Sequence, residues 1–490
     1  MVGNGRNIGE LAARRRRRTW IALGLSFVVV VAVLVAGLVI VRPWTPEFRH
    51  GGLTVAEPPA PVRPTPRLVP APASAPAPSP AGIGAALGPV VGNPDLGAFT
   101  GIVTDADSAT TLWSSDPTKP MIPSSTAKIL TTAAALLALP EDQRVVTRVV
   151  TGSAAGEAVL VGGGDPTLTA RPDGLGYYPN SARLSDLVEQ IRSSGRPVDT
   201  IVVDTSAYTG ATMAQGWDPI DVPEGSIAPI ESVMIDGGRL DPLVEYSPRT
   251  STPALDAGRQ LATALGLDPS RVRAGSAVAG AAELASVRSA PLRDRLRDMM
   301  VHSDNVLAET IGREIAVATG REPSFAGAVA AVADTLRKAG FDLTGATMFD
   351  GSGLSVDDRL PARLLDEILA TAARADGVGA GGEATTVQSG QAKPRTDELA
   401  ATLAPLLDAL PVAGATGSLT SRYVTANRGA AGWVRAKTGT LSVASALVGY
   451  VLDRDGRVLT FALMSNDRPP EVSRPALDAI AGTLRNCGCS

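Results

Sequence analysis

The chain has 490 residues, of which 44% are hydrophobic and 19% are charged, and its formal net charge is −4 at pH 7. This balance fits a globular protein of more than one domain and excludes disorder throughout. Residues 42–490 carry 39 basic and 48 acidic residues, so nucleic acid is not expected as a partner of that part.

The N-terminal segment predicts a membrane anchor. Five consecutive arginines, Arg14–Arg18, precede an apolar run over residues 21–41 that contains no charge. As a helix this run would be roughly 31 Å long, enough to cross a bilayer. Arginines on the N-terminal side keep that end in the cytoplasm. We therefore expect a basic cytoplasmic tail over 1–18, a single-pass signal anchor over 19–41, and a catalytic part outside the cytoplasm. A cleaved signal peptide is the alternative, but no small-residue cleavage pattern follows the run.

A proline-rich stretch follows the apolar run. Ten prolines occur from Pro58 to Pro80, interleaved with Ala, Ser and Val, which favours an extended, polyproline-like backbone. The sequence therefore predicts a linker over 42–89 and a folded domain that starts near residue 90.

A hairpin and a helix are the first folded elements expected. Residues 98–105 and 110–113 are rich in strand formers and flank a polar turn, which predicts two paired strands. An Ala- and Leu-rich run without Gly predicts a buried helix from near Ser125 to Leu139. Helical spacing would place Ser125 and Lys128 on one face, one turn apart.

The sequence pattern changes over residues 145–285, where short Val, Ile and Leu runs alternate with Gly, Pro and Asp. This pattern predicts one or more small inserted domains. The flanking segments 90–144 and 286–490 would then form the catalytic domain together. Within the second flank, residues 292–318 are helical in pattern, with a break near Ser303, and residues 375–393 predict a mobile surface loop.

The C-terminal region predicts two strands and a helix. The strands are expected over 444–452 and 458–465, and the helix over 473–484 with Ser473 as a possible N-cap. The only two cysteines, Cys487 and Cys489, follow at the end of the chain, so no disulfide framework supports the fold. A small disulfide, a metal contact and no function at all remain alternatives for the pair.

Three short motifs carry the chemistry. Each occurs once and in this order: Ser125-x-x-Lys128, Ser303-Asp304-Asn305 and Lys437-Thr438-Gly439. The chain uses Arg for most positive charges, yet two of its five lysines stand in this set. A base that must lose its proton can be Lys but not Arg, because a guanidinium stays charged. The set therefore indicates a serine nucleophile with a lysine base.

We expect a distinct role for each member of the first two motifs. Lys128 would accept the proton of Ser125 if burial and a second cation, Lys437, lowered its pKa. Ser303 would relay a proton toward the leaving group. Asn305 would hold the substrate backbone and the Lys128 ammonium.

The third motif would bind the substrate. Lys437 and Thr438 would donate hydrogen bonds to a substrate carboxylate. The backbone N–H groups of Ser125 and Thr440 would stabilise the developing oxyanion.

Each motif alone also has a structural explanation. Ser125 and Ser303 could cap helices, and the two lysines could be solvated charges. Their joint occurrence in order favours the catalytic interpretation. A Ser-His-Asp hydrolase is disfavoured, because only His50 and His302 are present and Gly-x-Ser-x-Gly is absent.

This ordered set is found in penicillin-binding proteins and class A β-lactamases. The chain resembles the D-alanyl-D-alanine carboxypeptidases and endopeptidases of the penicillin-binding protein four type, the class C low-molecular-mass group. Further segments that carry the resemblance are Gly162–Leu168, Ser303–Glu309, Asp350–Ser355, Leu410–Gly414 and Ala436–Leu441. The resemblance implies an α/β (α+β) serine transpeptidase/β-lactamase-like domain. Its antiparallel sheet would be flanked by helices and its sequence interrupted by inserted small domains between the first two motifs.

The resemblance also implies an activity. Ser125 would attack the carbonyl before the terminal D-alanine of a peptidoglycan stem peptide and form an acyl-enzyme that water hydrolyses, without a metal or organic cofactor. β-Lactams would trap Ser125 as covalent inhibitors. Endopeptidase action on cross-links uses the same residues and stays an alternative. A β-lactamase-like hydrolase and a non-catalytic cell-wall-binding protein are the others, and the intact Ser125 and Lys128 disfavour the last.

Overall fold

The computed structural model describes residues 20, 27–41, 75–171, 173–374 and 394–489, without the side chains of 394–396. The chain divides into two units, Met1–Val69 and Pro70–Ser490. The expected tail over 1–18, most of the linker and the loop over 375–393 lie outside the described residues.

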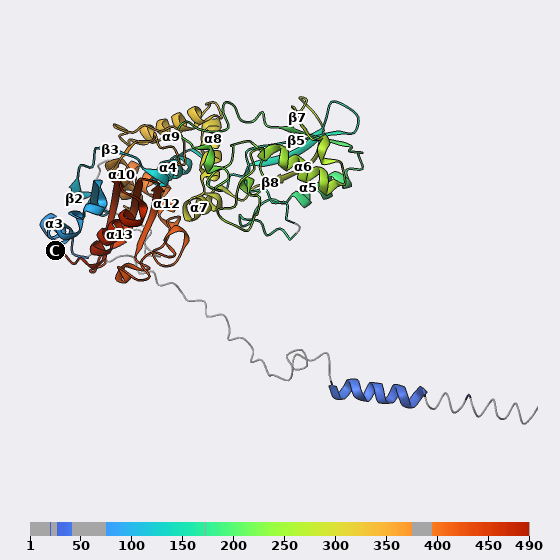
Figure 1. Cartoon of the computed structure of the whole chain (residues 1–490), viewed down its shortest axis with the longest axis horizontal. Coiled ribbons are helices and arrows are strands. Elements are labelled where there is room, and N and C mark those ends of the chain that lie inside the picture. The colour runs from blue at the N-terminus through green and yellow to red at the C-terminus, as the bar shows by residue number, and fades with distance from the viewer. Residues whose placement is uncertain (1–19, 21–26, 42–74, 172, 375–393, 490) are drawn as a thin grey trace, which may run out of the picture. The chain divides into compact units, whose positions relative to one another are not determined.

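In the first unit, residues 27–41 form a helix with exposed apolar side chains (Figure 1). Among the residues described, no helix combines the length and the hydropathy that crossing a bilayer requires. The signal anchor over 19–41 stays a prediction.

A five-stranded antiparallel sheet forms the centre of the second unit, in the order β10-β11-β12-β1-β2. The strands are β1 Ala98–Asp105, β2 Thr110–Ser115, β10 Val434–Leu441, β11 Ala444–Leu452 and β12 Val458–Asn466. The predicted N-terminal hairpin and C-terminal strand pair are confirmed, and β12 pairs with β1 across most of the chain length. A third C-terminal strand, β10, carries Lys437 and lies at an edge of the sheet.

Helices cover both faces of this sheet, as the expected fold class requires. Helices α3 (Pro80–Val91) and α13 (Pro470–Asn486) pack together on one face, and α4 (Lys128–Ala138) and α10 (Ala362–Ala373) lie over the other. Successive strand residues point to opposite faces. Leu447 of β11 accordingly enters the core beneath α13, whereas its neighbour Val448 enters the core beneath α10.

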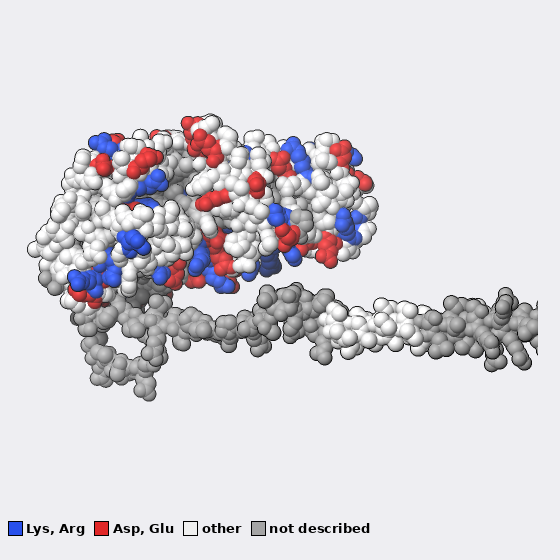
Figure 2. Space-filling view, turned by 60° about the horizontal axis from the view of Figure 1, so that its bottom comes forward, with Lys and Arg blue, Asp and Glu red and all other residues white. Residues whose placement is uncertain are grey.

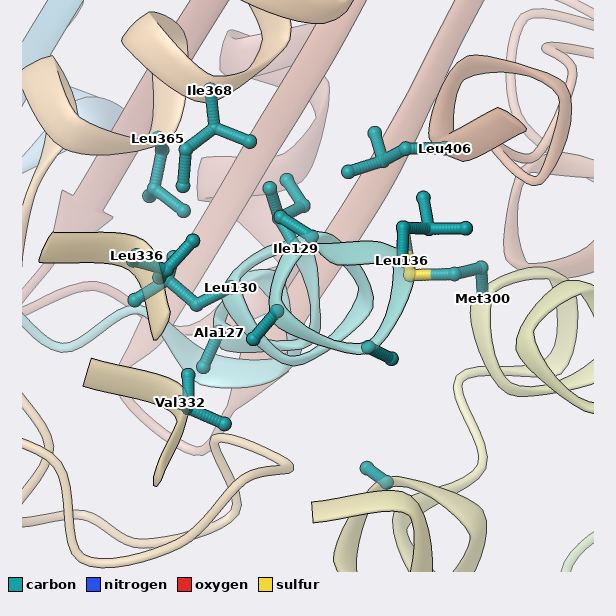
Figure 3. Packing of buried hydrophobic residues seen from close by; sticks show 14 of the residues in the cluster. Ala127, Ile129, Leu130, Leu136, Met300, Val332, Leu336, Leu365, Ile368 and Leu406 are labelled. Atoms are coloured by element: carbon teal, nitrogen blue, oxygen red, sulfur yellow. The ribbon is translucent and has the colours of Figure 1, made fainter. Parts of the chain in front are cut away.

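The helical core surrounds α4. Its Ala- and Leu-rich sequence is buried on almost every side, which is typical of a helix inside a domain. Figure 3 shows Ile129 and Leu130 of α4 among Leu336, Ile368 and Leu406 from neighbouring helices. The other elements here are α7 Leu292–His302, α8 Asn305–Ala318, α9 Phe325–Ala339, α11 Pro394–Leu403, α12 Pro405–Asp408, β3 Pro120–Met121 and β9 Leu360–Pro361. The helical prediction over 292–318 is confirmed, and its break falls between α7 and α8.

A second sheet is built from residues 146–288, in the order β7-β6-β5-β4-β8. Its elements are β4 Val146–Thr151, β5 Glu157–Val161, α5 Leu184–Ser193, β6 Thr200–Asp204, α6 Pro253–Leu265, β7 Arg273–Ala274 and β8 Glu283–Arg288. The apolar runs form its strands, and their side chains make a separate core with α5 and α6. The boundaries of the inserted domain stay a prediction.

Two element boundaries differ from expectation. Most of helix α3 lies inside the expected linker: Pro80 occupies its first turn, Ser79 caps it, and Ile83 and Leu87 are fully buried. Proline suits the first helical position because the amide it lacks would be unpaired there. For the same reason α13 begins at Pro470. Ser473 is therefore not an N-cap but lies within the helix and donates to Ser445 Oγ at 2.8 Å.

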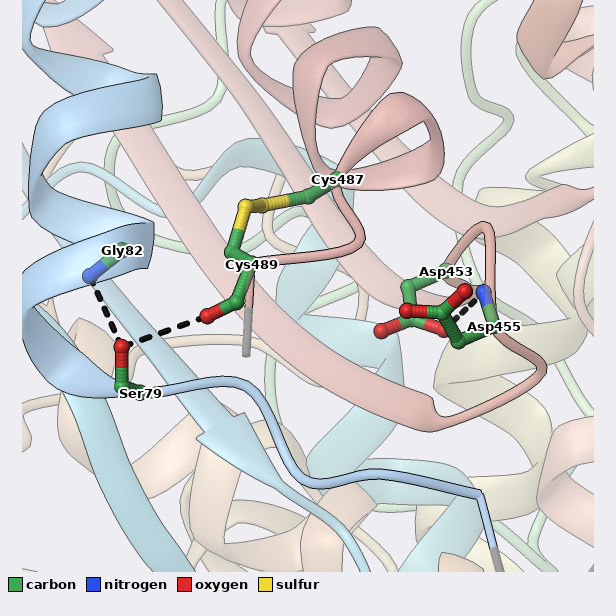
Figure 4. The surroundings of a disulfide bond; sticks show 6 residues. All are labelled: Ser79, Gly82, Asp453, Asp455, Cys487 and Cys489. Atoms are coloured by element: carbon green, nitrogen blue, oxygen red, sulfur yellow. Dashed lines mark hydrogen bonds between the residues drawn. A yellow bond between two sulfur atoms is a disulfide. The ribbon is translucent and has the colours of Figure 1, made fainter.

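Cys487 and Cys489 form a disulfide (Figure 4). Beside it, the Cys489 carbonyl accepts a hydrogen bond from Ser79 N at 2.8 Å. The C-terminal end of the fold thus contacts the residue that caps α3.

The surface of the second unit carries charges of both signs. On the face drawn in Figure 2, Lys and Arg side chains lie between Asp and Glu side chains rather than in one basic field.

Candidate active site

Ser125 lies in a short 3₁₀ turn, Ser124–Ala127, that leads directly into α4. Lys128 is the first residue of α4 and has no exposed surface, whereas Ser125 is half-buried. Lys128 Nζ lies 3.0 Å from Ser125 Oγ. The pair is therefore in hydrogen-bond contact, one turn apart, as the spacing predicts.

Two further acceptors fix the Lys128 amine. It donates to Asn305 Oδ1 at 2.6 Å and to the Ser352 carbonyl at 2.8 Å. Burial lowers the pKa of Lys128 to about 8, although the negative charges of Asp350, Asp304 and Glu309 oppose the change. A lysine with this pKa can accept a proton far more readily than a solvated one.

The second motif occupies the break between α7 and α8. Ser303 adopts a left-handed backbone with φ of 57°, and Asp304 caps α8 by accepting a hydrogen bond from Leu307 N. Asn305 donates from Nδ2 to the Ser226 carbonyl at 2.9 Å, so its amide oxygen is directed at Lys128.

The third motif approaches on β10. Lys437 is fully buried and donates to Ser303 Oγ at 2.8 Å and to the Thr438 carbonyl at 2.9 Å. Burial, with the charge of Lys128 adding to it, lowers the pKa of Lys437 well below its usual value. Gly439 is required for this approach, because a Cβ there would lie 2.6 Å from the Pro123 carbonyl oxygen.

All eight predicted site residues converge on one cleft of about 430 Å³. Ser125, Ser303, Asn305, Thr438 and Thr440 line it. Lys128, Lys437 and Gly439 lie directly behind these residues, through the contacts given above. His302 also lines the cleft, where its ring contacts Tyr177. In the described part of the chain, no three His, Cys, Asp or Glu side chains are grouped as metal ligands.

Sequence reasoning missed the residues of segment 146–288 that hold the second motif. Arg239 forms a buried ion pair with Asp304 at 3.1 Å, and Tyr178 donates to the same carboxylate at 2.9 Å. The Arg239 guanidinium lies 3.3 Å from the centre of the Tyr177 ring. No short motif marks these residues, because their partner Asp304 is distant in sequence.

Ser418 was also missed. Its hydroxyl lies 2.7 Å from Thr438 Oγ1, and both residues line the cleft. Ser418 sits in a short turn with no sequence pattern that would have singled it out.

Arg239→Met should destabilise the chain, because it leaves the Asp304 charge buried without its partner. We expect a loss of about 3–5 kcal/mol in the free energy of unfolding, measured by urea denaturation. Burial disfavours the ionised form of Asp304, but Arg239 and Arg249 outweigh it and hold its pKa at about 2. The stabilisation is thus present above the ordinary pKa of 3.8 and is lost as pH falls toward 2, and this acid-dependent part should shrink in the variant.

The matched control is Arg259→Met, because Arg259 forms an exposed ion pair with Asp256. Its free energy of unfolding should change by less than about 0.5 kcal/mol. Equal losses for the two variants would contradict the role given to Arg239.

Comparison with known proteins agrees with this geometry. The sequence pattern of the D-Ala-D-Ala carboxypeptidase 3 (S13) family matches residues 84–248, 243–380 and 396–487. Carboxypeptidase DacB of Mycolicibacterium smegmatis is 48% identical over 483 residues, covering 97% of this chain and 99% of that protein. A D-alanyl-D-alanine carboxypeptidase of an Actinomadura species is 28% identical over 472 residues, covering 79% of this chain and 81% of that protein.

The fold is shared with penicillin-binding protein 4 (dacB) of Haemophilus influenzae. The crystal structure of that protein superposes with a TM-score of 0.64 at 19% identity, covering 82% of this chain and 98% of that chain. The family pattern and the identity to the mycobacterial carboxypeptidase both extend over most of the sequence. The chain belongs to the D-Ala-D-Ala carboxypeptidase 3 (S13) family of serine peptidases.

Proposed function

We propose that this chain is a serine-type D-alanyl-D-alanine carboxypeptidase that acts on peptidoglycan stem peptides through an acyl-enzyme on Ser125. The observation that carries the proposal is the contact between Ser125 Oγ and Lys128 Nζ at the wall of an open cleft. Pure binding of a peptide requires neither a nucleophile nor a buried amine beside it.

Acylation begins with proton transfer. The neutral amine of Lys128 accepts the hydroxyl proton of Ser125 as Oγ bonds to the carbonyl carbon that precedes the terminal D-alanine. The carbonyl electron pair moves onto oxygen, where the backbone N–H groups of Ser125 and Thr440 stabilise it. β10 is an edge strand, so one row of its backbone groups is unpaired by the sheet.

Collapse of this intermediate releases D-alanine. Ser303, which accepts a hydrogen bond from Lys437, passes a proton to the leaving amine as the C–N bond breaks. The proton that Lys128 took from Ser125 replaces the one that Ser303 gave up, so the amine is neutral again. Water then attacks the acyl-enzyme carbonyl, Lys128 accepts a proton from this water, and the proton passes to Ser125 Oγ as the ester C–O bond breaks. Thr438, held by Ser418, is placed to donate a hydrogen bond to the carboxylate of the leaving residue.

Incubation with benzylpenicillin should add one drug mass to the intact chain. The amine that leaves the β-lactam carbonyl stays attached through the rest of the opened drug, so no part of the mass is lost. The adduct should be absent in Ser125→Ala and present in Ser193→Ala, an exposed serine on α5. Mass spectrometry of the intact protein makes the measurement. The penicillin-binding protein 4 of Haemophilus influenzae has been solved in complex with a β-lactam, which supports this expectation.

The alternatives give different results with the same preparation. Folded protein that neither gains mass nor consumes the drug would favour the non-catalytic binding protein. Rapid drug hydrolysis would favour a β-lactamase-like enzyme. Release of D-alanine from a stem pentapeptide would identify a carboxypeptidase, and cleavage of cross-linked dimers would identify an endopeptidase.

The acylation rate should rise with pH through a midpoint near pH 8 and level off about one to two units higher, because the pKa of Lys128 is lowered to about 8 and the neutral amine is the base. Lys128→Arg should acylate roughly 10³-fold more slowly, since a guanidinium cannot accept the proton. Lys119→Arg, at an exposed lysine, should leave the rate unchanged. Stopped-flow acylation by a chromogenic cephalosporin measures both, and a wild-type rate in Lys128→Arg would exclude Lys128 as the base.

We further propose that residues 19–41 anchor the chain in the cytoplasmic membrane, with the second unit outside the cytoplasm. The arginine run and the exposed apolar side chains of helix 27–41 support this location. Two arginines in the segment, Val30→Arg with Leu34→Arg, each cost about 2.5–3.5 kcal/mol of insertion energy and should move the chain to the soluble fraction. Carbonate extraction of membranes and the intact mass make the test. Recovery of a chain that starts after residue 41 would instead indicate a cleaved signal peptide.

A further inference from the structure

The loop over residues 350–355 packs against the Ser124–Ala127 turn and the start of α4. Its Ser352 carbonyl accepts the hydrogen bond from Lys128 Nζ, and its Gly351 carbonyl accepts one from Thr131 Oγ1 at 2.7 Å. Gly353 packs directly against the turn, because a Cβ at that position would lie 1.9 Å from the Ser124 carbonyl oxygen. A small movement of this loop would therefore move an acceptor of Lys128.

Two buried carboxylates hold the loop in this shape: Glu309 Oε1 accepts from Gly351 N at 3.0 Å, and Asp350 makes the remaining contacts. Asp350 has no exposed surface and accepts hydrogen bonds from four donors. Its Oδ1 accepts from Ser352 N at 3.1 Å and Gly353 N at 2.6 Å. Its Oδ2 accepts from Ser355 N and from Trp217 Nε1, each at 2.7 Å. Three of the donors are backbone groups of the loop itself, and the fourth comes from segment 146–288.

Asp358 lies near the Asp350 carboxylate and favours the charged form of Asp350. Burial, followed by the nearby charge of Asp350, raises the pKa of Asp358 to about 10, so its carboxyl is protonated at neutral pH. A protonated carboxyl carries no charge, so it does not repel the Asp350 carboxylate. Asp358 thus adds a neutral partner rather than a second negative charge.

We propose that Asp350 is a positioning residue for the base: by bending the 350–355 loop it aims the Ser352 carbonyl at the Lys128 amine, and Trp217 secures it in that position. A neutral lysine amine has two N–H donors and one lone pair, arranged tetrahedrally. The Ser352 carbonyl and Asn305 Oδ1 take the two donors, which leaves the lone pair directed at Ser125 Oγ. Without the Ser352 acceptor the amine could rotate, and the lone pair would lose its direction.

The charge of Asp350 gives a second effect with the opposite sign. The charged groups that face Lys128 are Lys437 on β10, Asp304 and Glu309 at α8, and Asp350 in the loop. Removing the Asp350 charge alone would lower the pKa of Lys128 and raise the fraction of neutral base at a given pH. A purely electrostatic role therefore predicts faster acylation below pH 8, whereas a positioning role predicts slower acylation at every pH.

The test is carried out on the full chain with Asp350→Asn and Trp217→Phe. An asparagine can face the loop amides with its oxygen, but its NH₂ then meets two donors, Ser355 N and Trp217 Nε1. At every pH between 6 and 10, we expect Asp350→Asn to be acylated about 100-fold more slowly than wild type, because a misplaced catalytic group costs a rate factor of this size. Trp217→Phe removes one donor but keeps the ring that contacts Phe325 at 5.1 Å, and should slow acylation about 10-fold. Asp357→Asn, at a partly exposed acid of the adjoining segment, should acylate like wild type.

The readout is the first-order acylation rate at saturating β-lactam, normalised to folded protein by active-site titration. This rate is insensitive to loss of folded molecules, so a merely structural role would leave it unchanged. A normal rate in both variants, or an Asp350→Asn rate profile displaced only to lower pH, would overturn the inference. If Asp350→Asn does not fold, Trp217→Phe alone decides. The inference rests on the proposed function. If the wild-type chain forms no adduct, the proposed function itself is contradicted, rather than the role of Asp350.

Discussion

The candidate active site depends on one constraint: the amine of Lys128 is buried in the core beside Ser125, where water does not solvate it. It begins a helix that is apolar on almost every side, so water cannot solvate its ammonium form, and its pKa falls to about 8. Full burial of a lysine can lower the pKa by several units more. Asp350, Asp304 and Glu309 limit the fall, and Asn305 and Ser352 supply the acceptors that water would otherwise provide. The lowered pKa of Lys128 therefore depends on the residues that bury its amine.

The three motifs meet because each lies where an element begins, breaks or forms an edge. Ser125 precedes α4, Ser303 lies between α7 and α8, and Lys437 lies on the edge strand β10. Gly439 removes the side chain that would separate β10 from the serine turn. Segment 146–288 is more than a spacer between motifs. It supplies Arg239 to Asp304, the Ser226 carbonyl to Asn305, and Trp217 to Asp350.

The sequence was sufficient for the features that repeat along a chain or occur in short patterns. Residue composition predicted the hairpin and the helix after Ser125, and a helical pattern predicted the broken helix around Ser303. The three motifs predicted eight residues that the structure places in or directly behind one cleft. Contacts between distant segments had no local pattern, so Arg239, Ser418 and Trp217 were missed. Asp350 stood within a recognised segment, but its role depends on a backbone bend that composition does not reveal. Proline misled at the start of the folded unit, since Pro80 was assigned to the linker but begins helix α3.

The contact between Ser79 and Cys489 brings the two ends of the folded unit within hydrogen-bond distance. The unit is thus almost a closed ring of chain, and a connection of a few residues would be enough to join its ends. The central sheet already has this character, since β12 from the end of the sequence pairs with β1 from its start. The position at which this ring of chain is open is therefore incidental to the arrangement of the cleft. A circular permutant opened at an exposed turn far from the cleft, such as the one around Gly280, would retain every strand neighbour of the sheet that carries Lys437.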